Sequence, residues 1–290
     1  TPNTPFSNIG KCECINTTCE LPNTMKIYII TDLEGVAGIV IEEQTRPGAK
    51  YYDEARLLLT REVNAAVEGA LDGGADEILV NDGHNGGFNI MLEELHEEAK
   101  LVHGVPRTFS LVGLDRGVDV VFLIGYHAMA GTPRAVLDHT MSSLAIHDVY
   151  LNGVKVGEIG LMAAIAGYYD VPVGLVTGCE KACEEARKLL GDVEFVVTKR
   201  GYGRNYAITL SPKKARKLIR EASKRAVTRA KKGEFKPFRV ESPVELKIVY
   251  NKTVFADSFE GKPMIERLDS RTILCRGDDL LKVLRAVGFC

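Results

Sequence analysis

The sequence predicts an α/β fold, with a mainly parallel sheet covered by helices on both faces and a smaller α+β C-terminal part. Three observations support this prediction. Short apolar runs alternate with longer segments of helical periodicity. The runs at 26–30, 77–81 and 118–124 are almost continuously apolar, as expected of strands buried on both faces. Glycine follows each run within a few residues, which is typical of strand ends.

The remaining elements follow from local signals. Residues 53–72 carry an apolar stripe at helical spacing and end at Gly73-Gly74, which predicts a helix. Asn152-Gly153 predicts a hairpin over 148–156, and Ser211-Pro212 is a favourable N-cap and first-turn pair. We expect further helices at 89–98, 158–169, 180–190, 211–232 and 278–287, and further strands at 171–176 and 244–250.

Composition divides the chain into three parts. Residues 1–24 are rich in Thr, Asn, Pro and Cys, and we expect an unstructured or loosely attached leader. Residues 25–198 form the predicted α/β domain, and residues 199–290 a smaller α+β region with an approximate boundary. The leader cysteines, Cys12, Cys14 and Cys19, lack paired CxxC spacing, so a loose tail is favoured over a metal site or a disulfide.

The overall composition argues against several classes of partner. The 290 residues carry a formal net charge of -2, so no global attraction to nucleic acid or to an anionic membrane is expected. No apolar run approaches the length of a membrane span, and the polar N-terminus does not resemble a secretory signal. Seven cysteines without regular spacing fit a reducing cytoplasm. The basic face of 211–232 is expected to be solvated, in preference to binding phosphate.

The first strand ends in two carboxylates. Asp32 and Glu34 are spaced i, i+2, so in an extended chain they project to the same side. Two adjacent carboxylates repel each other unless a cation or a proton lies between them. This pair is the first indication of a metal site.

Two further strands end in similar residues. Asp82 and His84 follow the second strand, and His127 follows the third. In parallel α/β sheets, ligands bind beyond the carboxyl ends of the strands, so these residues are expected to meet. Glu158 lies at a predicted helix start, where the helix dipole favours a carboxylate.

Carboxylates and imidazoles together suit zinc or a similar divalent ion. Three carboxylates and two histidines exceed the needs of one tetrahedral zinc ion, and they suit two ions that share a bridging carboxylate. Such a pair can hold a hydroxide and polarise a carbonyl. Each residue taken alone also has an ordinary structural explanation, and it is their common position at strand ends that favours a metal site.

His139 has no ligand partner at standard spacing. As a free imidazole near the metals, it could hydrogen-bond a tetrahedral intermediate or move a proton. The other histidines, His96, His103 and His147, lie in charged or loop contexts and are expected at the surface.

Five motifs occur together in the order and approximate spacing of a known family. They are Thr31-Asp32-Leu33-Glu34-Gly35, Asn81-Asp82-Gly83-His84, Gly125-Tyr126-His127-Ala128, Asp138-His139-Thr140-Met141 and Gly157-Glu158-Ile159-Gly160-Leu161. In these motifs the chain resembles the D-aminopeptidases of peptidase family M55, from Met25 to the C-terminal Phe289-Cys290. The leader is foreign to the family pattern, and Gly83 and Arg134 are mild departures that touch no proposed ligand.

The resemblance implies a dizinc site. Asp32 would bridge both ions, Glu34 and His127 would complete the shell of one, and His84 and Glu158 that of the other. His139 would be the catalytic histidine, described in the family as the nucleophile. On physical grounds we favour attack by a metal-bound hydroxide, with His139 assisting as base or electrophile.

The resemblance also implies a substrate and an assembly. Family members release N-terminal D-amino acids from short peptides and form a homo-oligomer, a decamer of two pentameric rings. One alternative is a dinuclear metallohydrolase that acts on another amide or ester with the same ligands. A nucleotide-binding protein is a further alternative, but Gly35-Val36-Ala37-Gly38 is a poor substitute for a glycine fingerprint, and Asp32 and Glu34 would repel phosphate.

Overall fold

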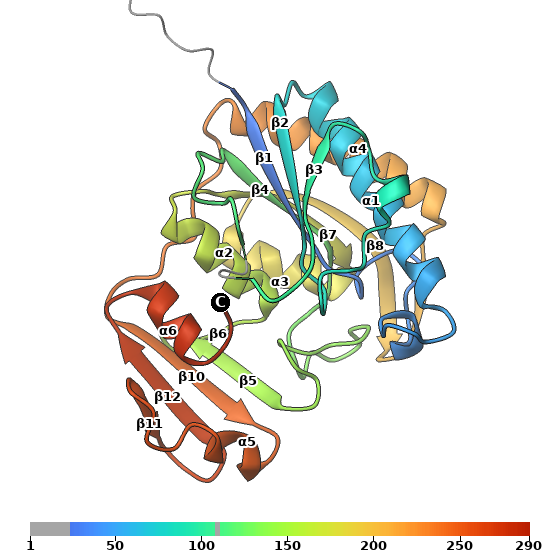
Figure 1. Cartoon of the computed structure of the whole chain (residues 1–290). Helices are drawn as coiled ribbons and strands as arrows, with labels where there is room; N and C mark the ends of the chain where they lie inside the picture. Colours follow the sequence, from blue (N-terminus) through green and yellow to red (C-terminus); the bar gives the residue numbers. More distant parts are fainter. Residues whose placement is uncertain (1–23, 108–110) are drawn as a thin grey trace, which may run out of the picture.

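The computed structural model describes residues 24–107 and 111–290 as two sheets with their covering helices (Figure 1). Nearly all of the expected leader, including its three cysteines, lies outside the described residues. Within the described residues, no helix combines the length and the apolar character needed to cross a membrane.

The larger sheet has seven strands in the order β3-β2-β1-β4-β7-β8-β9. All neighbouring pairs are parallel except β8 and β9, which are antiparallel. The central strands β1, β4 and β7 are almost completely buried, in agreement with their continuous apolar sequences. The bounds are β1 Lys26–Thr31, β2 Glu77–Asp82, β3 Ala99–Val102, β4 Val120–Tyr126, β7 Val173–Cys179, β8 Glu194–Gly203 and β9 Tyr206–Thr209.

Helices cover both faces of this sheet (Figure 1). α1 (Tyr52–Asp72) and α4 (Pro212–Ala230) pack against each other on one face, whereas α2 (Glu158–Tyr168) and α3 (Glu180–Leu190) pack together on the other. The side-chain hydroxyl of Ser211 caps α4 by accepting from the Lys214 amide. This arrangement confirms the predicted fold class.

The smaller sheet has five strands in the order β11-β12-β10-β5-β6, and it lies below the larger sheet in Figure 1. Its described pairings are all antiparallel. The bounds are β5 Ile146–Leu151, β6 Val154–Lys155, β10 Val244–Tyr250, β11 Ile265–Arg267, β12 Thr272–Gly277, α5 Thr253–Asp257 and α6 Leu280–Ala286.

The division of the chain between the two sheets differs from the domain boundary expected from composition. The boundary expected after residue 198 falls inside β8, and α4 packs on the larger sheet. The predicted hairpin is present as β5 and β6, but β5 pairs with β10 in the smaller sheet. The smaller sheet is therefore built from two separated segments, a long-range pairing that local composition does not report.

The helix expected at 89–98 is wrong. This segment holds only a single 3₁₀ turn, Leu92–Glu94, and is otherwise irregular. Its backbone is fixed by side chains instead, because the amides of Asn89 and Ile90 both donate to the Asp82 carboxylate, at 2.6 and 2.8 Å. Hydrogen bonds to this buried carboxylate take the place of the backbone hydrogen bonds of a helix.

β1 occupies the point where the strand order reverses. The chain proceeds from β1 through α1 to β2 and β3 on one side, whereas β4, β7 and β8 lie on the other. In open α/β sheets, a crevice forms beyond the strand ends at such a point. The residues that follow β1, β2 and β4 therefore lie at the expected position of a site.

Candidate metal centre

The loop after β1 is held against the end of β4. The Asp32 amide donates to the Ile124 carbonyl at 2.8 Å, and the Gly35 amide donates to the Gly125 carbonyl at 2.7 Å. A Cβ atom at Gly35 would lie 2.0 Å from the Tyr126 carbonyl oxygen. Glycine is therefore required for this approach, which directs the side chains of Asp32 and Glu34 into the crevice.

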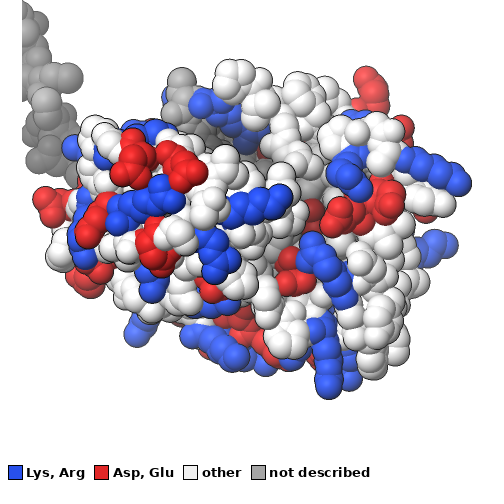
Figure 2. All heavy atoms as spheres, turned by 90° about the horizontal axis from the view of Figure 1, so that it is seen from below, with Lys and Arg blue, Asp and Glu red and all other residues white. Residues whose placement is uncertain are grey.

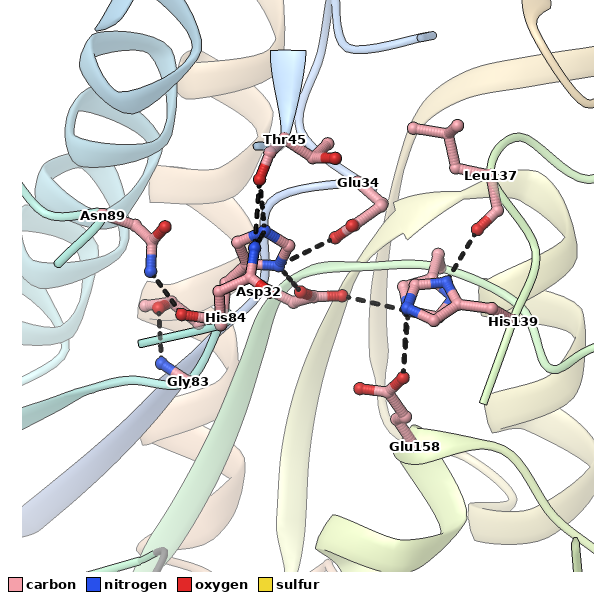
Figure 3. A network of polar contacts seen from close by, with 12 residues as sticks. Asp32, Glu34, Thr45, Gly83, His84, Asn89, Leu137, His139 and Glu158 are labelled. Carbon is pink, nitrogen blue, oxygen red and sulfur yellow. Dashed lines mark hydrogen bonds and ion pairs between the residues drawn. The ribbon is translucent and has the colours of Figure 1, made fainter. Parts of the chain in front are cut away.

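His84 faces both of these carboxylates. Its Nδ1 lies 3.0 Å from Asp32 Oδ1 and 3.2 Å from Glu34 Oε2, and its Nε2 lies 2.9 Å from the Thr45 carbonyl oxygen (Figure 3). A carbonyl only accepts, so we assign the hydrogen of the neutral ring to Nε2, and the Asn85 side-chain amide donates to the same Thr45 carbonyl oxygen at 3.1 Å. Nδ1 then presents its lone pair to Asp32 and Glu34.

His127 approaches Asp32 from the other side. Its Nδ1 is 2.9 Å from the Ala128 carbonyl oxygen, which leaves Nε2 facing Asp32 Oδ2 at 3.3 Å and Glu158 Oε1 at 3.4 Å. Glu158 begins α2, and its Oε1 accepts from the Met141 amide at 2.7 Å. The two oxygens of Asp32 therefore face different histidines, which is the geometry of a bridging carboxylate.

His139 completes the cluster. Its Nδ1 is 2.9 Å from the Leu137 carbonyl oxygen, and its Nε2 is 3.5 Å from Glu158 Oε1 (Figure 3). The neighbouring Asp138 is fixed by Arg204, whose Nη1 lies 2.7 Å from Asp138 Oδ1. This ion pair, together with the Arg204 carbonyl that accepts from the Leu137 amide at 2.9 Å, orients the segment that carries His139.

The structure thus brings together the expected catalytic histidine and the five expected metal ligands, namely His139 and Asp32, Glu34, His84, His127 and Glu158, but not the further candidate Asp82. Direct contacts join Glu34 to His84 and Glu158 to His127. The resemblance divides the ligands differently, with Glu34 beside His127, and ligand atoms of Asp32, Glu34 and His127 also lie within 4.8 Å of one another. In both divisions Asp32 is the shared carboxylate.

The donor set fits a divalent metal. Asp32 Oδ2, Glu34 Oε2 and His127 Nε2 are buried and have no hydrogen-bond partner among the described residues. Buried polar atoms are normally satisfied, so atoms left unsatisfied in one place need a partner. The other nitrogen of each imidazole faces a backbone carbonyl, the arrangement that commonly orients histidine ligands of zinc.

The electrostatics of the cluster also call for a cation. Burial and the negative charge of Glu34 raise the pKa of Asp32 to about 7. Burial opposes the charging of the His84 and His127 rings, but the surrounding carboxylates prevail and raise the pKa of both rings well above the usual value. Without a metal, the cluster therefore tends to hold protons near neutral pH. A bound metal ion would supply the positive charge that these protons otherwise provide.

Asp82 does not join the cluster. Sequence placed it among the potential ligands, but its carboxylate accepts from the backbone amides of Asn89 and Ile90 and from the Asn89 side-chain amide at 2.6 Å. Asn89 also donates to the His84 carbonyl at 2.5 Å. Asp82 thus holds the turn that positions His84.

Two buried residues that support the site were not predicted. Lys199, in β8, donates to the carbonyls of Glu34, Val36 and Ile39 at 2.5, 2.7 and 2.5 Å. Glu62, in α1, accepts from the Ala37 amide at 2.9 Å. Together they fix the loop after Glu34. The helical period of α1 places Glu62 on the buried stripe and could have indicated it, whereas nothing in the β8 sequence distinguishes Lys199.

Glu185 supports the opposite side of the cluster. This buried α3 residue accepts from the Met129 amide at 2.8 Å, and its pKa is raised to about 7 by burial, against the opposing effect of hydrogen bonds from the Met129 and Gly157 amides. Met129 follows the His127 loop, and Gly157 precedes Glu158. One side chain therefore joins the two segments that carry these residues.

Two cavities border the cluster. The first, of about 410 Å³, is lined by Glu34, His84, His139, Arg46 and Arg204, among others. The second, of about 260 Å³, lies at the ends of β1, β2 and β4. Asp32 and Glu158 line both cavities. The face drawn in Figure 2 carries basic and acidic side chains interspersed, in agreement with the small net charge.

The fold and this cluster define an α/β protein with a site of the metallohydrolase type. The family model of the M55 peptidases, described as D-aminopeptidase, matches residues 25–289, and the chain belongs to this family. It is 35% identical over 267 residues to a D-aminopeptidase of Bacillus subtilis (strain 168), covering 91% of this chain and 95% of that protein.

A solved structure supports the same relationship. The Zn-dependent D-aminopeptidase DppA from Bacillus subtilis, described as a self-compartmentalizing protease, matches with a TM-score of 0.84 at 34% identity. The match covers 90% of this chain and 95% of the solved chain.

Proposed function

We propose that this protein is a zinc-dependent aminopeptidase that removes the N-terminal residue, in the D-configuration, from short peptides. The observation that carries the proposal is the buried cluster around Asp32, whose two oxygens face His84 and His127. Membership of the D-aminopeptidase family and the likeness to a Zn-dependent member support the metal and the stereochemistry.

Two zinc ions per chain are proposed, and Asp32 would contribute to holding both. Glu34 and His127 would hold one ion with it, and His84 and Glu158 would hold the other. When bound, zinc supplies Lewis acidity that polarises the scissile carbonyl and makes water a better nucleophile near neutral pH. Hydrogen bonds to the backbone hold the ligand-bearing loops in place, and they are made by the buried side chains of Lys199, Glu62 and Glu185.

His139 is proposed to move the proton. Its Nδ1 is oriented by the Leu137 carbonyl, which leaves Nε2 facing the cluster. Burial lowers the pKa of His139, so the ring is neutral near pH 7 and can accept a proton, and the positive charge of a metal ion held by His127 would act in the same direction. It takes that proton from the attacking water and returns it to the leaving amine nitrogen.

The first cavity suits the remainder of a short peptide. Arg46 and Arg204 line it. A short peptide ends in a carboxylate close to its scissile bond, and a guanidinium is a good partner for such a group. This charge favours substrates of a few residues over long chains.

We also propose that the protein assembles as a homo-oligomer, a decamer of two pentameric rings. A related protease is described as self-compartmentalizing, which requires an enclosing assembly. The chain has an edge strand, β9, on which Tyr206 and Ile208 are exposed. Light scattering after gel filtration, which gives the mass of the particle, tests this proposal against the 31.8 kDa chain.

The decisive experiment is a panel of matched L- and D-dipeptides offered to zinc-loaded protein, with zinc measured per chain. We expect about two zinc ions, hydrolysis of D-Ala-D-Ala, and loss of both on chelation. Hydrolysis of L-Ala-L-Ala alone would overturn the D-configuration. Hydrolysis confined to unrelated amides or esters would point to a different dinuclear metallohydrolase.

A further inference from the structure

The second cavity has walls of a different kind from the first. Apolar side chains form much of its surface, from Ile30 at the end of β1 to Phe289 near the end of the chain. Val105, Leu111, Met141 and Met162 also line it. Figure 1 shows the C-terminal segment close to α2, between the two sheets. Segments far apart in sequence therefore enclose one apolar space.

The guanidinium of Arg107, which lines this cavity, is held by hydrogen bonds to the residues around it. Arg107 donates through Nε to the Gly104 carbonyl at 2.6 Å, and through its two other nitrogens to Asn81 Oδ1 and the Asp82 carbonyl, both at 2.8 Å. These bonds tie the guanidinium to the backbone at the end of β2. The cavity is thus suited to an apolar group, in contrast to the arginine-lined first cavity.

The reacting carbonyl has one substituent on each side. Asp32 and Glu158 border both cavities, so a peptide carbonyl placed at these carboxylates extends one half of the substrate into each cavity. His139 lines the first cavity and not the second. A group that protonates the leaving amine must be near that nitrogen, so the leaving half belongs in the first cavity. The N-terminal residue belongs in the second.

We propose that the second cavity is the specificity pocket for the N-terminal residue, and that Met162 and Phe289 set the size of the apolar side chain it accepts. This inference rests on the proposed aminopeptidase activity. Met162 lies four residues after Glu158 in α2, hence on the same helix face one turn further along. A side chain that enters the second cavity beside Glu158 therefore lies next to Met162.

The volume supports selection by size. The second cavity, at about 260 Å³ against about 410 Å³ for the first, is the smaller of the two and is large enough for an amino-acid side chain. Hydrophobic pockets discriminate between side chains by roughly 10- to 200-fold for each methylene added or lost. Replacing the flexible, apolar side chain of Met162 by a smaller or larger apolar one changes the volume of the pocket without adding charge.

The test compares two substrate series on zinc-loaded protein. In the D-Xaa-Gly series the first residue varies from D-Ala to D-Leu and D-Phe, and in the D-Ala-Xaa series the second residue varies. Met162→Ala should raise the kcat/KM ratio of D-Phe-Gly to D-Ala-Gly by about 10-fold or more. Met162→Phe should lower the D-Leu-Gly to D-Ala-Gly ratio by about as much. Neither variant should change the relative preference among second residues within the D-Ala-Xaa series.

The matched control is Leu144→Ala. Leu144 lines the first cavity and not the second, and its side chain is exposed. This variant should therefore alter the relative preference within the D-Ala-Xaa series and leave the relative preference within the D-Xaa-Gly series unchanged. Because Met162 is buried, thermal melting must show that its variants are folded, and Phe289→Leu provides a second way to enlarge the pocket. Calorimetric binding of free D-Ala, D-Leu and D-Phe gives a readout that does not depend on turnover.

The outcomes separate the two proposals. A wild-type protein that binds zinc but hydrolyses no D-dipeptide would overturn the aminopeptidase assignment itself. An active wild type whose folded Met162 and Phe289 variants keep the same first-residue preference would overturn the pocket assignment alone. A shift confined to the second-residue series would exchange the roles of the two cavities.

Discussion

The rings of His127 and His139 are stacked, with their centroids 4.0 Å apart and 9° between their planes. Each ring has Nδ1 2.9 Å from a backbone carbonyl oxygen, and both Nε2 atoms face Glu158 Oε1, at 3.4 and 3.5 Å. The two histidines therefore share one carboxylate oxygen. Their proposed roles, ligand and proton carrier, are separated by measuring metal content and turnover together.

The first prediction concerns His139. His139→Ala should retain zinc close to the wild-type level but lower kcat for D-Ala-D-Ala by about 10²–10⁴-fold, because general acid–base catalysis contributes about that much. His127→Ala should lose metal as well as turnover. The exposed His147 offers a matched control, and His147→Ala should behave as wild type. Full activity in His139→Ala would show that the assigned role is wrong.

The second prediction concerns the bridging carboxylate. Asp32→Ala should lose both zinc ions, because its two oxygens face the two sides of the cluster. Metal analysis after dialysis should find well under one zinc per chain, and hydrolysis of D-Ala-D-Ala should be abolished. Asp53→Ala is the control, since the Asp53 side chain is 87% exposed. Retention of one tightly bound ion in Asp32→Ala would argue against a bridging role.

The third prediction concerns Lys199. Lys199→Met removes a buried donor from the carbonyls of Glu34, Val36 and Ile39, and unsatisfied buried groups cost about 1–3 kcal/mol each. We expect a loss of about 2–4 kcal/mol in the free energy of unfolding, measured by denaturant titration with zinc present. Zinc affinity should fall about 10- to 100-fold, because the loop carrying Glu34 loses its support.

Lys252→Met is the control for that measurement, because Lys252 is exposed and lies far from the loop in sequence. It should change neither stability nor zinc affinity appreciably. A Lys199→Met protein with wild-type zinc affinity would show that the loop holds its position without this side chain.

The fourth prediction concerns pH and Glu62. Burial raises the pKa of Glu62 to about 7, against the opposing effects of the Ala37 amide and the Lys199 cation. Between about pH 4.5 and 7 the folded state therefore binds more protons at Glu62 than the unfolded state. The contribution of Glu62 to stability is fully present below about pH 4.5 and is lost as the pH rises through 7.

Glu62→Gln removes this titration. The difference in unfolding free energy between Glu62→Gln and wild type should increase with pH from 4.5 to 7 by about 3 kcal/mol and then level off. Urea titrations at matched pH values measure it. Glu185, with its own raised pKa, remains in both proteins and cancels in the difference. A difference that is constant over this range would contradict the assignment.

Local sequence was sufficient to predict helices and strands where the spacing of apolar residues matches their burial in the structure. The apolar run of β1, the stripe of α1 and the Ser211-Pro212 start of α4 were each predicted close to their bounds. It failed at 89–98, where the Asp82 carboxylate binds the backbone amides that a helix would have used. Local sequence also missed the strand β8. The domain boundary expected after residue 198 was inferred from composition, and β8 crosses it.

The sequence by itself determined the fold class and the chemical identity of the cluster, since strand-end carboxylates and imidazoles in a parallel sheet have only one crevice to share. The tertiary structure decided what no local pattern encodes: the nitrogen that each histidine turns toward the carboxylates, and the support of the Glu34 loop by Lys199. The tertiary structure also places Met162 and Phe289 in the wall of the second cavity. The Lys199 support and the second cavity depend on contacts between residues more than a hundred positions apart, whereas the orientation of His127 and His139 depends on the backbone conformation beside each ring. In both cases packing geometry selects among conformations that the local chain permits equally.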